Sequence, residues 1–364
     1  MSDIAVPRAA APGAVRISSR TFDWLMAALG GLFILGLYID GWAHNHLEGI
    51  ETFFTPWHAL FYGSFLLLAL VFGAYVAAGL SANLQDRSDI LKRWARAIPR
   101  GYEWSALGVG LFFVSGACDM LWHLRFGIEQ NTEALLSPTH LGLATAMALI
   151  LTGPLRAAIA RGDDVSGAQL WPAVISFTSL FCGLTFILQF SPALVDWGVG
   201  VRPTDLTTSE LMLDRAVVSQ LLISTVMTGA VLFLVRQWGT KLPFGSLTVL
   251  IGANAALMSV QSGHRYYFAM LPAAIGAAVI ADCLNVWLLP TESAVRFRWF
   301  AFLVPFVYWS AHYLDYLVRG ESVWWKIHVW AGLPVIAGLI GLLLSFLAIS
   351  SAPMPRAEPA DTRA

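Results

Sequence analysis

The chain has 364 residues, of which 57% are hydrophobic and 12% are charged, with a formal net charge of −1. Soluble proteins carry about 25% charged residues, so this composition excludes a soluble enzyme, a disordered chain and a disulfide-rich scaffold. The nearly neutral charge gives no reason to expect a nucleic-acid partner, because binding to phosphates requires a basic surface. Long apolar runs recur along the chain, and about 18 or more such residues can cross a bilayer as a helix. The sequence therefore predicts an integral membrane protein embedded in the lipid bilayer.

The apolar runs predict an all-α, polytopic bundle of about ten transmembrane helices. These cover residues of about 22–44, 54–80, 103–126, 138–160, 170–190, 212–235, 246–263, 266–289, 298–318 and 326–350. Residues 1–21 are expected to form a cytoplasmic segment, because the run that follows is long for a signal peptide and lacks an obvious cleavage site. Residues 22–350 are then a single transmembrane domain, and the proline-containing residues 351–364 a disordered cytoplasmic tail.

The distribution of basic residues predicts the orientation of this bundle, since Lys and Arg accumulate in cytoplasmic loops. With both termini in the cytoplasm, 16 of the 22 Lys and Arg residues fall on the inner side. All eight histidines then fall in the outer half. Ionisable groups at membrane depth are costly and usually pair, bind ions or line polar cavities. We therefore expect a functional layer at the outer face, on the periplasmic side if the membrane is a bacterial inner membrane.

Two segments in the first half of the chain, 36–64 and 115–146, repeat one order of residues. Each has Asp and His four residues apart, then a Gly-Ile-Glu tract and a second His, and matching positions are offset by 79, 78 and 82 residues. Asp and His at that spacing lie on one helix face and can reach one ion. The predicted ligands are Asp40, His44 and His58 in the first segment and Asp119, His123 and His140 in the second.

A helix start precedes the second histidine of each segment. Thr55 and Ser137 each precede a proline, and a hydroxyl residue followed by proline is typical of a helix N-cap and first helical position. His58 and His140 would then lie in the first turn of a returning helix. Each segment is therefore predicted to be a helical hairpin that brings one carboxylate and two imidazoles together at its outer end.

Other polar residues form weaker candidates. Glu51 and Glu129 are either solvated loop acids or partners that orient the imidazoles. A later set has a histidine before the acid, the reverse of the order in the two repeated segments. It is a possible additional metal or substrate site: His312, Asp315 and His328. Asp282 is either a proton-relay acid or a hydrogen-bonded buried carboxylate, whereas His46 and His264 are expected to be interfacial residues.

One Asp with two His suits copper(II), zinc or non-haem iron, because imidazole binds all three metals. Spacing alone does not choose among them. Apart from the metal, the residues leave two functions open. One is a metal-ion transporter or metal-handling protein with Asp282 in an inward path, and the other is a non-catalytic assembly subunit whose polar hairpins dock a periplasmic partner.

The repeated Asp-x-x-x-His and His order resembles the copper-binding pattern in the membrane-embedded C subunit of particulate methane and ammonia monooxygenases. The resemblance covers about residues 36–142. That family has Asn where this chain has Asp119, and here the gap from His123 to His140 is longer than the corresponding gap in the first segment.

This resemblance implies that each hairpin forms one copper site. It also implies oxygen activation near the outer face, a small apolar substrate that arrives through lipid, and electrons from a quinol or a periplasmic donor. Other membrane subunits would be partners of such a chain.

Overall fold

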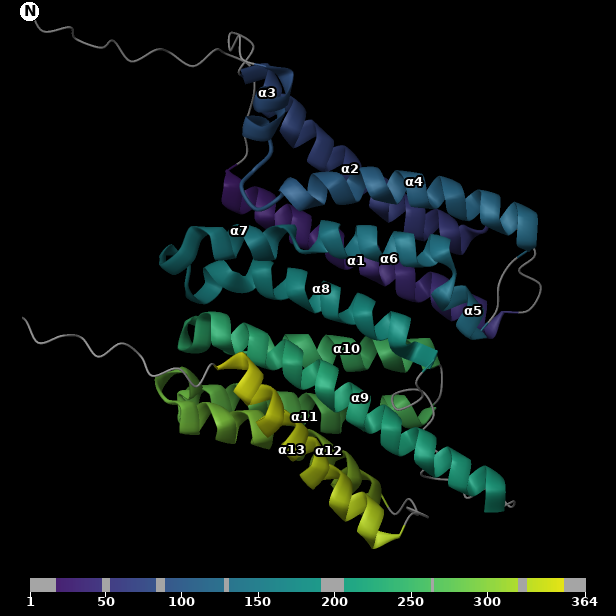
Figure 1. Cartoon of the computed structure of the whole chain (residues 1–364), viewed down its shortest axis with the longest axis vertical. Helices are drawn as coiled ribbons and strands as arrows, with labels where there is room; N and C mark the ends of the chain where they lie inside the picture. The colour runs from purple at the N-terminus through teal and green to yellow at the C-terminus, as the bar shows by residue number, and fades with distance from the viewer. Residues whose placement is uncertain are drawn as a thin grey trace, which may run out of the picture. The chain divides into compact units, whose positions relative to one another are not determined.

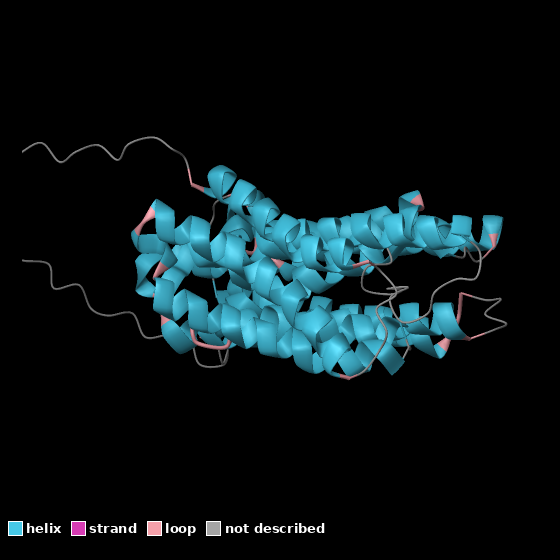
Figure 2. Ribbon diagram, turned by 90° about the horizontal axis from the view of Figure 1, so that it is seen from below, coloured by secondary structure: helices cyan, strands magenta, loops and turns pink. Residues whose placement is uncertain are grey.

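The computed structural model describes residues 18–47, 53–82, 89–127, 131–190, 206–262, 265–319 and 326–349. Within these ranges the chain forms helices joined by turns, and it contains no strand (Figures 1 and 2). Eight helical segments are long and apolar enough to cross a membrane. The predicted all-α class is therefore confirmed for these residues, and the eight segments are compatible with a helical membrane bundle.

Each of the ten predicted spans coincides with a helical segment, but two of them are outside that set of eight. Helix α10 (Ser246–Ser262) has 17 residues and is short for a membrane span. Helix α12 (Ala294–Val318) has 25 residues, and Arg296, Arg298 and Asp315 interrupt its apolar sequence. The count of ten and the cytoplasmic location of both termini therefore stay predictions.

The described residues belong to two compact units, of which the first comprises residues 1–195 and 242–271 and the second residues 196–241 and 272–364. The helices of the first unit are α1 (Ser19–His46), α2 (Pro56–Ala82), α3 (Ile90–Ala97), α4 (Glu103–Phe126), α5 (Asn131–Leu136), α6 (Pro138–Leu151), α7 (Gly153–Arg161), η1 (Gly162–Asp164), η2 (Gly167–Leu170), α8 (Trp171–Ile187), η3 (Leu188–Phe190) and α10. Helix α1 packs against α2, α8 and α10, and α4 packs against α6. Helix α11 (Arg265–Leu288) crosses the boundary between the units.

The repeated segments form two helical hairpins, α1 with α2 and α4 with α6, and glycine allows close helix approach in each. A Cβ atom at Gly36 would lie 3.1 Å from the Cα of Phe61, and one at Gly108 would lie 2.8 Å from the carbonyl oxygen of Ala146. Small residues at such positions let the backbones of membrane helices approach closely. The hairpin geometry that the sequence predicts is thus supported along the length of the helices.

The predicted single span over residues 138–160 is two helices in the structure. Helix α6 ends at Leu151, Thr152 has a ψ of 2°, and α7 follows. Pro154 lies in the first turn of α7, where its missing N–H costs no hydrogen bond, whereas the same proline inside a helix would clash with the preceding turn. By contrast, Pro272 lies inside the continuous helix α11.

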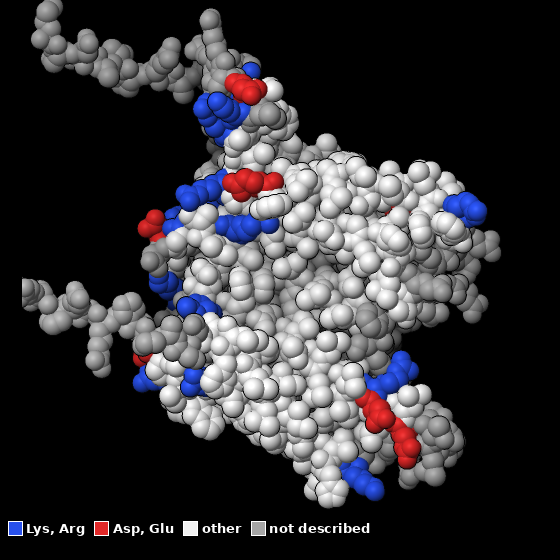
Figure 3. Space-filling model, in the orientation of Figure 1, with Lys and Arg blue, Asp and Glu red and all other residues white. Residues whose placement is uncertain are grey.

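The end of the first unit that is remote from the repeated histidines is held by an ion pair between the buried Asp23 and the half-buried Arg161. The Arg161 guanidinium at the end of α7 donates to the Asp23 carboxylate near the start of α1, and the Tyr102 hydroxyl donates to the other oxygen of Asp23 at 2.8 Å. Basic side chains gather at the end of this unit that carries α3 and α7 (Figure 3). The long sides of the helices are mostly uncharged.

The second unit contains α9 (Leu206–Trp238), η4 (Gly239–Lys241), η5 (Pro290–Glu292), α12 and α13 (Ile327–Ala348), together with most of α11. Helix α12 packs closely on α13, where a Cβ atom at Gly341 would overlap the carbonyl oxygen of Ala301. Trp309 Nε1 of α12 donates to Ser224 Oγ of α9 at 2.6 Å. This unit therefore has a core of its own, with glycine packing and a buried polar contact.

Candidate metal centre

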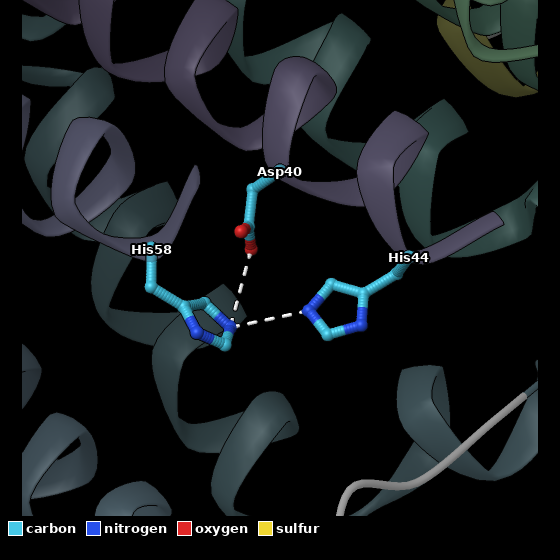
Figure 4. Close-up of side chains that lie close together, drawn as sticks. All are labelled: Asp40, His44 and His58. Carbon is cyan, nitrogen blue, oxygen red and sulfur yellow. Dashed lines mark hydrogen bonds and ion pairs between the residues drawn. The ribbon is translucent and has the colours of Figure 1, made fainter. Parts of the chain in front are cut away.

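The first hairpin brings Asp40, His44 and His58 together. One ligand atom from each lies within 4.8 Å of the others. The His58 Nε2 atom lies 3.6 Å from Asp40 Oδ2 and 3.2 Å from His44 Nε2. Figure 4 shows the three side chains pointing toward one another, with His58 Nε2 facing both partners. Asp40 and His58 are buried and His44 is half-buried, so the group is largely shielded from the surroundings.

Local structure fixes each of these side chains. Asp40 and His44 are one turn apart near the end of α1, so both project from the same helix face. Thr55 Oγ1 accepts a hydrogen bond from the His58 backbone N–H at 3.1 Å, which is the predicted N-cap. The His58 Nδ1 lies 2.7 Å from the Phe53 carbonyl oxygen. Because a carbonyl can only accept, Nδ1 carries the proton and Nε2 is left as the ligand atom.

The second hairpin brings Asp119, His123 and His140 together in the same way, again within 4.8 Å. Asp119 Oδ1 lies 3.5 Å from His123 Nε2 and 3.4 Å from His140 Nε2. Asp119 and His123 are buried and His140 is half-buried. Both groups therefore place one carboxylate oxygen against imidazole nitrogens inside the first unit.

Backbone and hydroxyl groups orient this second pair of imidazoles as well. His123 Nδ1 donates to the Gly127 carbonyl oxygen at 3.3 Å. His140 Nδ1 lies 2.6 Å from Ser137 Oγ, and Ser137 is the N-cap of α6, which begins at Pro138 as predicted. The Nε2 atoms of both rings are consequently directed at Asp119.

The two groups are neighbours. The ring centroids of His58 and His123 are 6.4 Å apart. The Phe53 ring stacks on His58 at 5.1 Å and lies 6.0 Å from His123. An apolar ring thus covers the imidazoles where the two hairpins meet.

The donor sets fit a transition-metal ion. Nitrogen and oxygen ligands at about 2.1 Å in tetrahedral geometry lie about 3.4 Å from one another, close to the separations of 3.2 to 3.6 Å between facing atoms in these groups. Asp40 Oδ1 is buried with no hydrogen-bond partner in the described part of the chain, which is costly for a carboxylate unless a cation is present. Each triad could therefore hold a metal ion, and neither selects copper, iron or zinc.

Other predicted residues are not part of these groups. Glu51, Glu129 and His264 lie outside the described residues. His46 Nδ1 is 2.9 Å from the Trp42 carbonyl oxygen and its Nε2 is 3.1 Å from that of Ser262. The ring therefore lies between backbone carbonyl groups at the ends of α1 and α10 and donates to one of them in its neutral form, which is consistent with an interfacial role.

The later set is not brought together as a metal group. His312 is buried on α12 and donates from Nδ1 to the Tyr308 carbonyl oxygen at 2.7 Å, whereas Asp315 pairs with Arg319 at 2.8 Å. His328 is exposed at the start of α13, and Asp282 is buried in α11. Over the described residues, clusters of three or more possible ligands occur only at the two triads.

The sequence reasoning missed two hydroxyl residues at the second triad. Tyr62 Oη donates to Asp119 Oδ2 at 2.8 Å, and Thr139 Oγ1 donates to Asp119 Oδ1 at 3.0 Å. Tyr62 lies one turn after His58, and Thr139 directly precedes His140. Both residues lie on helices that carry triad histidines, and this position indicates a place near the site. The partner of Tyr62 is not indicated in this way, because Asp119 lies in the other hairpin.

Comparison with protein families, with curated proteins and with solved structures gives no match. The interpretation of the site therefore depends on its own geometry.

Proposed function

We propose that the chain is a membrane metalloprotein that binds copper at both triads and supports the oxidation of a small apolar substrate by O₂. The observation that carries the proposal is the convergence of one carboxylate and two imidazoles within 4.8 Å in each of two adjacent hairpins. Bound copper would supply one-electron redox chemistry and an O₂-binding position. Non-haem iron is the next metal that this ligand set favours.

Three features of the chain suit it to this role. Backbone carbonyls hold the His58 and His123 rings so that Nε2 faces the ligand position. The Asp40 and Asp119 carboxylates are buried and would offset the charge of a cation. The Phe53 ring covers the imidazoles and limits the access of water, which strengthens electrostatic interactions within the site.

The setting is also suited to an apolar substrate. Both triads lie at the ends of helices that are long and apolar enough to cross a membrane, and we propose that a small apolar substrate reaches them from the lipid. We propose that the triads face the periplasm of a bacterial inner membrane and receive electrons from a quinol or a periplasmic donor.

Oxygen uptake by the purified protein tests this function. Protein prepared with copper and without chelators is expected to consume O₂ when a quinol and a small apolar substrate are added, and Asp40→Ala or His123→Ala should abolish this uptake. His46→Ala is the matched control, because His46 is a histidine at the same helix ends but outside the triads. Bound copper without O₂ uptake in the presence of that substrate, with either a quinol or a strong chemical reductant, would contradict the proposed substrate oxidation and favour metal handling.

A further inference from the structure

The two triads contain the same ligand types but hold their carboxylates differently. Asp119 accepts hydrogen bonds at both oxygens, from Tyr62 at Oδ2 and from Thr139 at Oδ1. Asp40 has no comparable hydroxyl partners within the described ranges, and its Oδ1 is buried without a hydrogen bond there. Among the described residues, only the carboxylate of the second triad is oriented by hydroxyl hydrogen bonds.

The geometry of these two contacts directs one oxygen at the imidazoles. Asp119 Oδ1 is the atom that lies 3.5 Å from His123 Nε2 and 3.4 Å from His140 Nε2. Tyr62 holds the opposite oxygen, Oδ2. Hydrogen bonds to an ionised carboxylate are short and strong, so the tyrosine hydroxyl restrains rotation of the carboxylate away from the two histidines.

Tyr62 reaches Asp119 from the other hairpin. It lies on α2, one turn after His58, and its ring lies over Gly116 of α4. A Cβ atom at Gly116 would be only 3.0 Å from Tyr62 Cε1. The glycine three residues before Asp119 thus leaves the space that the tyrosine ring occupies, and the contact joins a helix of the first triad to the acid of the second.

We propose that Tyr62 and Thr139 are positioning residues that preorganise the Asp119 carboxylate for metal binding at the second triad. This inference rests on the proposed metal-binding function and adds to it a physical difference between the two sites. Groups that orient a metal ligand typically change metal affinity by about 10- to 100-fold when they are removed.

The test uses the full chain with the first triad removed by Asp40→Ala and His44→Ala, because both residues lie on α1 and their replacement leaves α2 and Tyr62 intact. Copper(II) is titrated into this parent protein in detergent, and its dissociation constant and electron paramagnetic resonance spectrum are recorded. Tyr62→Phe is then added. We expect the dissociation constant to rise about 10- to 100-fold and the copper hyperfine splitting to change.

A matched control is available at the remote end of the same unit. Tyr102 Oη donates to the buried Asp23 carboxylate at 2.8 Å, the same distance as from Tyr62 to Asp119. Tyr102→Phe removes an equivalent hydrogen bond, and thermal unfolding of the metal-free variants should show similar losses of stability. It should leave copper affinity and spectrum unchanged, which separates positioning from general destabilisation.

Thr139 provides a second pair of variants if Tyr62→Phe does not fold. Thr139→Val removes the hydroxyl and should weaken copper binding, whereas Thr139→Ser keeps it and should bind like the parent. Equal affinities and spectra for the parent and Tyr62→Phe, or for Thr139→Val and Thr139→Ser, would overturn the positioning role alone. A parent that binds no copper at its intact second triad would overturn the proposed function as well.

Discussion

The orientation of the His58 and His123 imidazoles is set by the chain's own turns. His58 donates to the carbonyl of Phe53, which precedes α2, and His123 donates to the carbonyl of Gly127, which follows α4. These bonds fix the tautomer with Nε2 as the ligand atom. Glu51 and Glu129 lie outside the described residues, so their predicted role as loop acids or as partners of the imidazoles stays a prediction.

Ser137 has two roles at the second triad, as the N-cap of α6 and as the partner of His140 Nδ1. Ser137→Ala should therefore lower stability by about 1 kcal/mol through loss of the cap and also weaken metal binding at this triad. Ser137→Thr keeps a hydroxyl and should retain both properties. Copper titration and thermal unfolding of the two variants check this, and a Ser137→Ala variant that binds copper as tightly as wild type would contradict it.

Helical spacing and cap chemistry were enough to predict both triads. Asp40 and His44 share a helix face because they are four residues apart, and Thr55 with Pro56 begins the helix that returns His58. The contact from Tyr62 to Asp119 could not be predicted in this way. It depends on packing between hairpins, which no local periodicity describes.

At the scale of helices, the two ends of the first unit are held by different interactions. Asp40, His44 and His58 gather where α1 ends, whereas Asp23 near its start contacts Arg161 of α7. Asp23 is buried and Arg161 is half-buried, and such a pair is costly to break because removal of one partner leaves an uncompensated charge. We infer that the remote ion pair is structural and independent of metal binding.

Asp23→Ala should therefore destabilise the protein by about 3 kcal/mol without changing copper affinity. Glu292→Ala is the comparison, because Glu292 and Arg296 form an exposed pair at 2.5 Å on consecutive turns, and exposed pairs contribute about 0 to 1 kcal/mol. Thermal unfolding of the purified variants measures the difference. Equal losses of stability in Asp23→Ala and Glu292→Ala, relative to wild type, would contradict the larger contribution of the Asp23 contact.

The break between α6 and α7 shows a limit of prediction at this scale. Hydropathy treats residues 138–161 as one continuous span, and the Gly153-Pro154 pair directly after Thr152 was the signal of an interruption. Proline is compatible with a helix start as well as with a kink. Apolar periodicity alone therefore could not decide whether one helix or two would form.

For the whole molecule, the division into two compact units separates the candidate residues. Both triads lie in the first unit, and Asp282, His312, Asp315 and His328 lie in the second. Apolar composition predicted the helical class of both units, but it could not assign residues to one unit or the other, since long-range packing determines that division.

The positive-inside rule gives a prediction for the orientation of the first unit. In a chain with Cys118, Cys182 and Cys283 replaced by Ala, Phe54→Cys lies at the triad end and Lys92→Cys at the basic end, and both positions are exposed. An impermeant maleimide applied to spheroplasts should label the first variant and not the second. Labelling of Lys92→Cys alone would reverse the predicted orientation.

Metal content per chain is the most direct test of the two-triad account. Elemental analysis of protein purified without chelators should find two metal ions per wild-type chain and one in each of the His58→Ala and His140→Ala variants. His46→Ala should retain two, because His46 bonds to backbone carbonyls outside both groups. Equal metal content in wild type and all three variants would contradict the assignment of both triads.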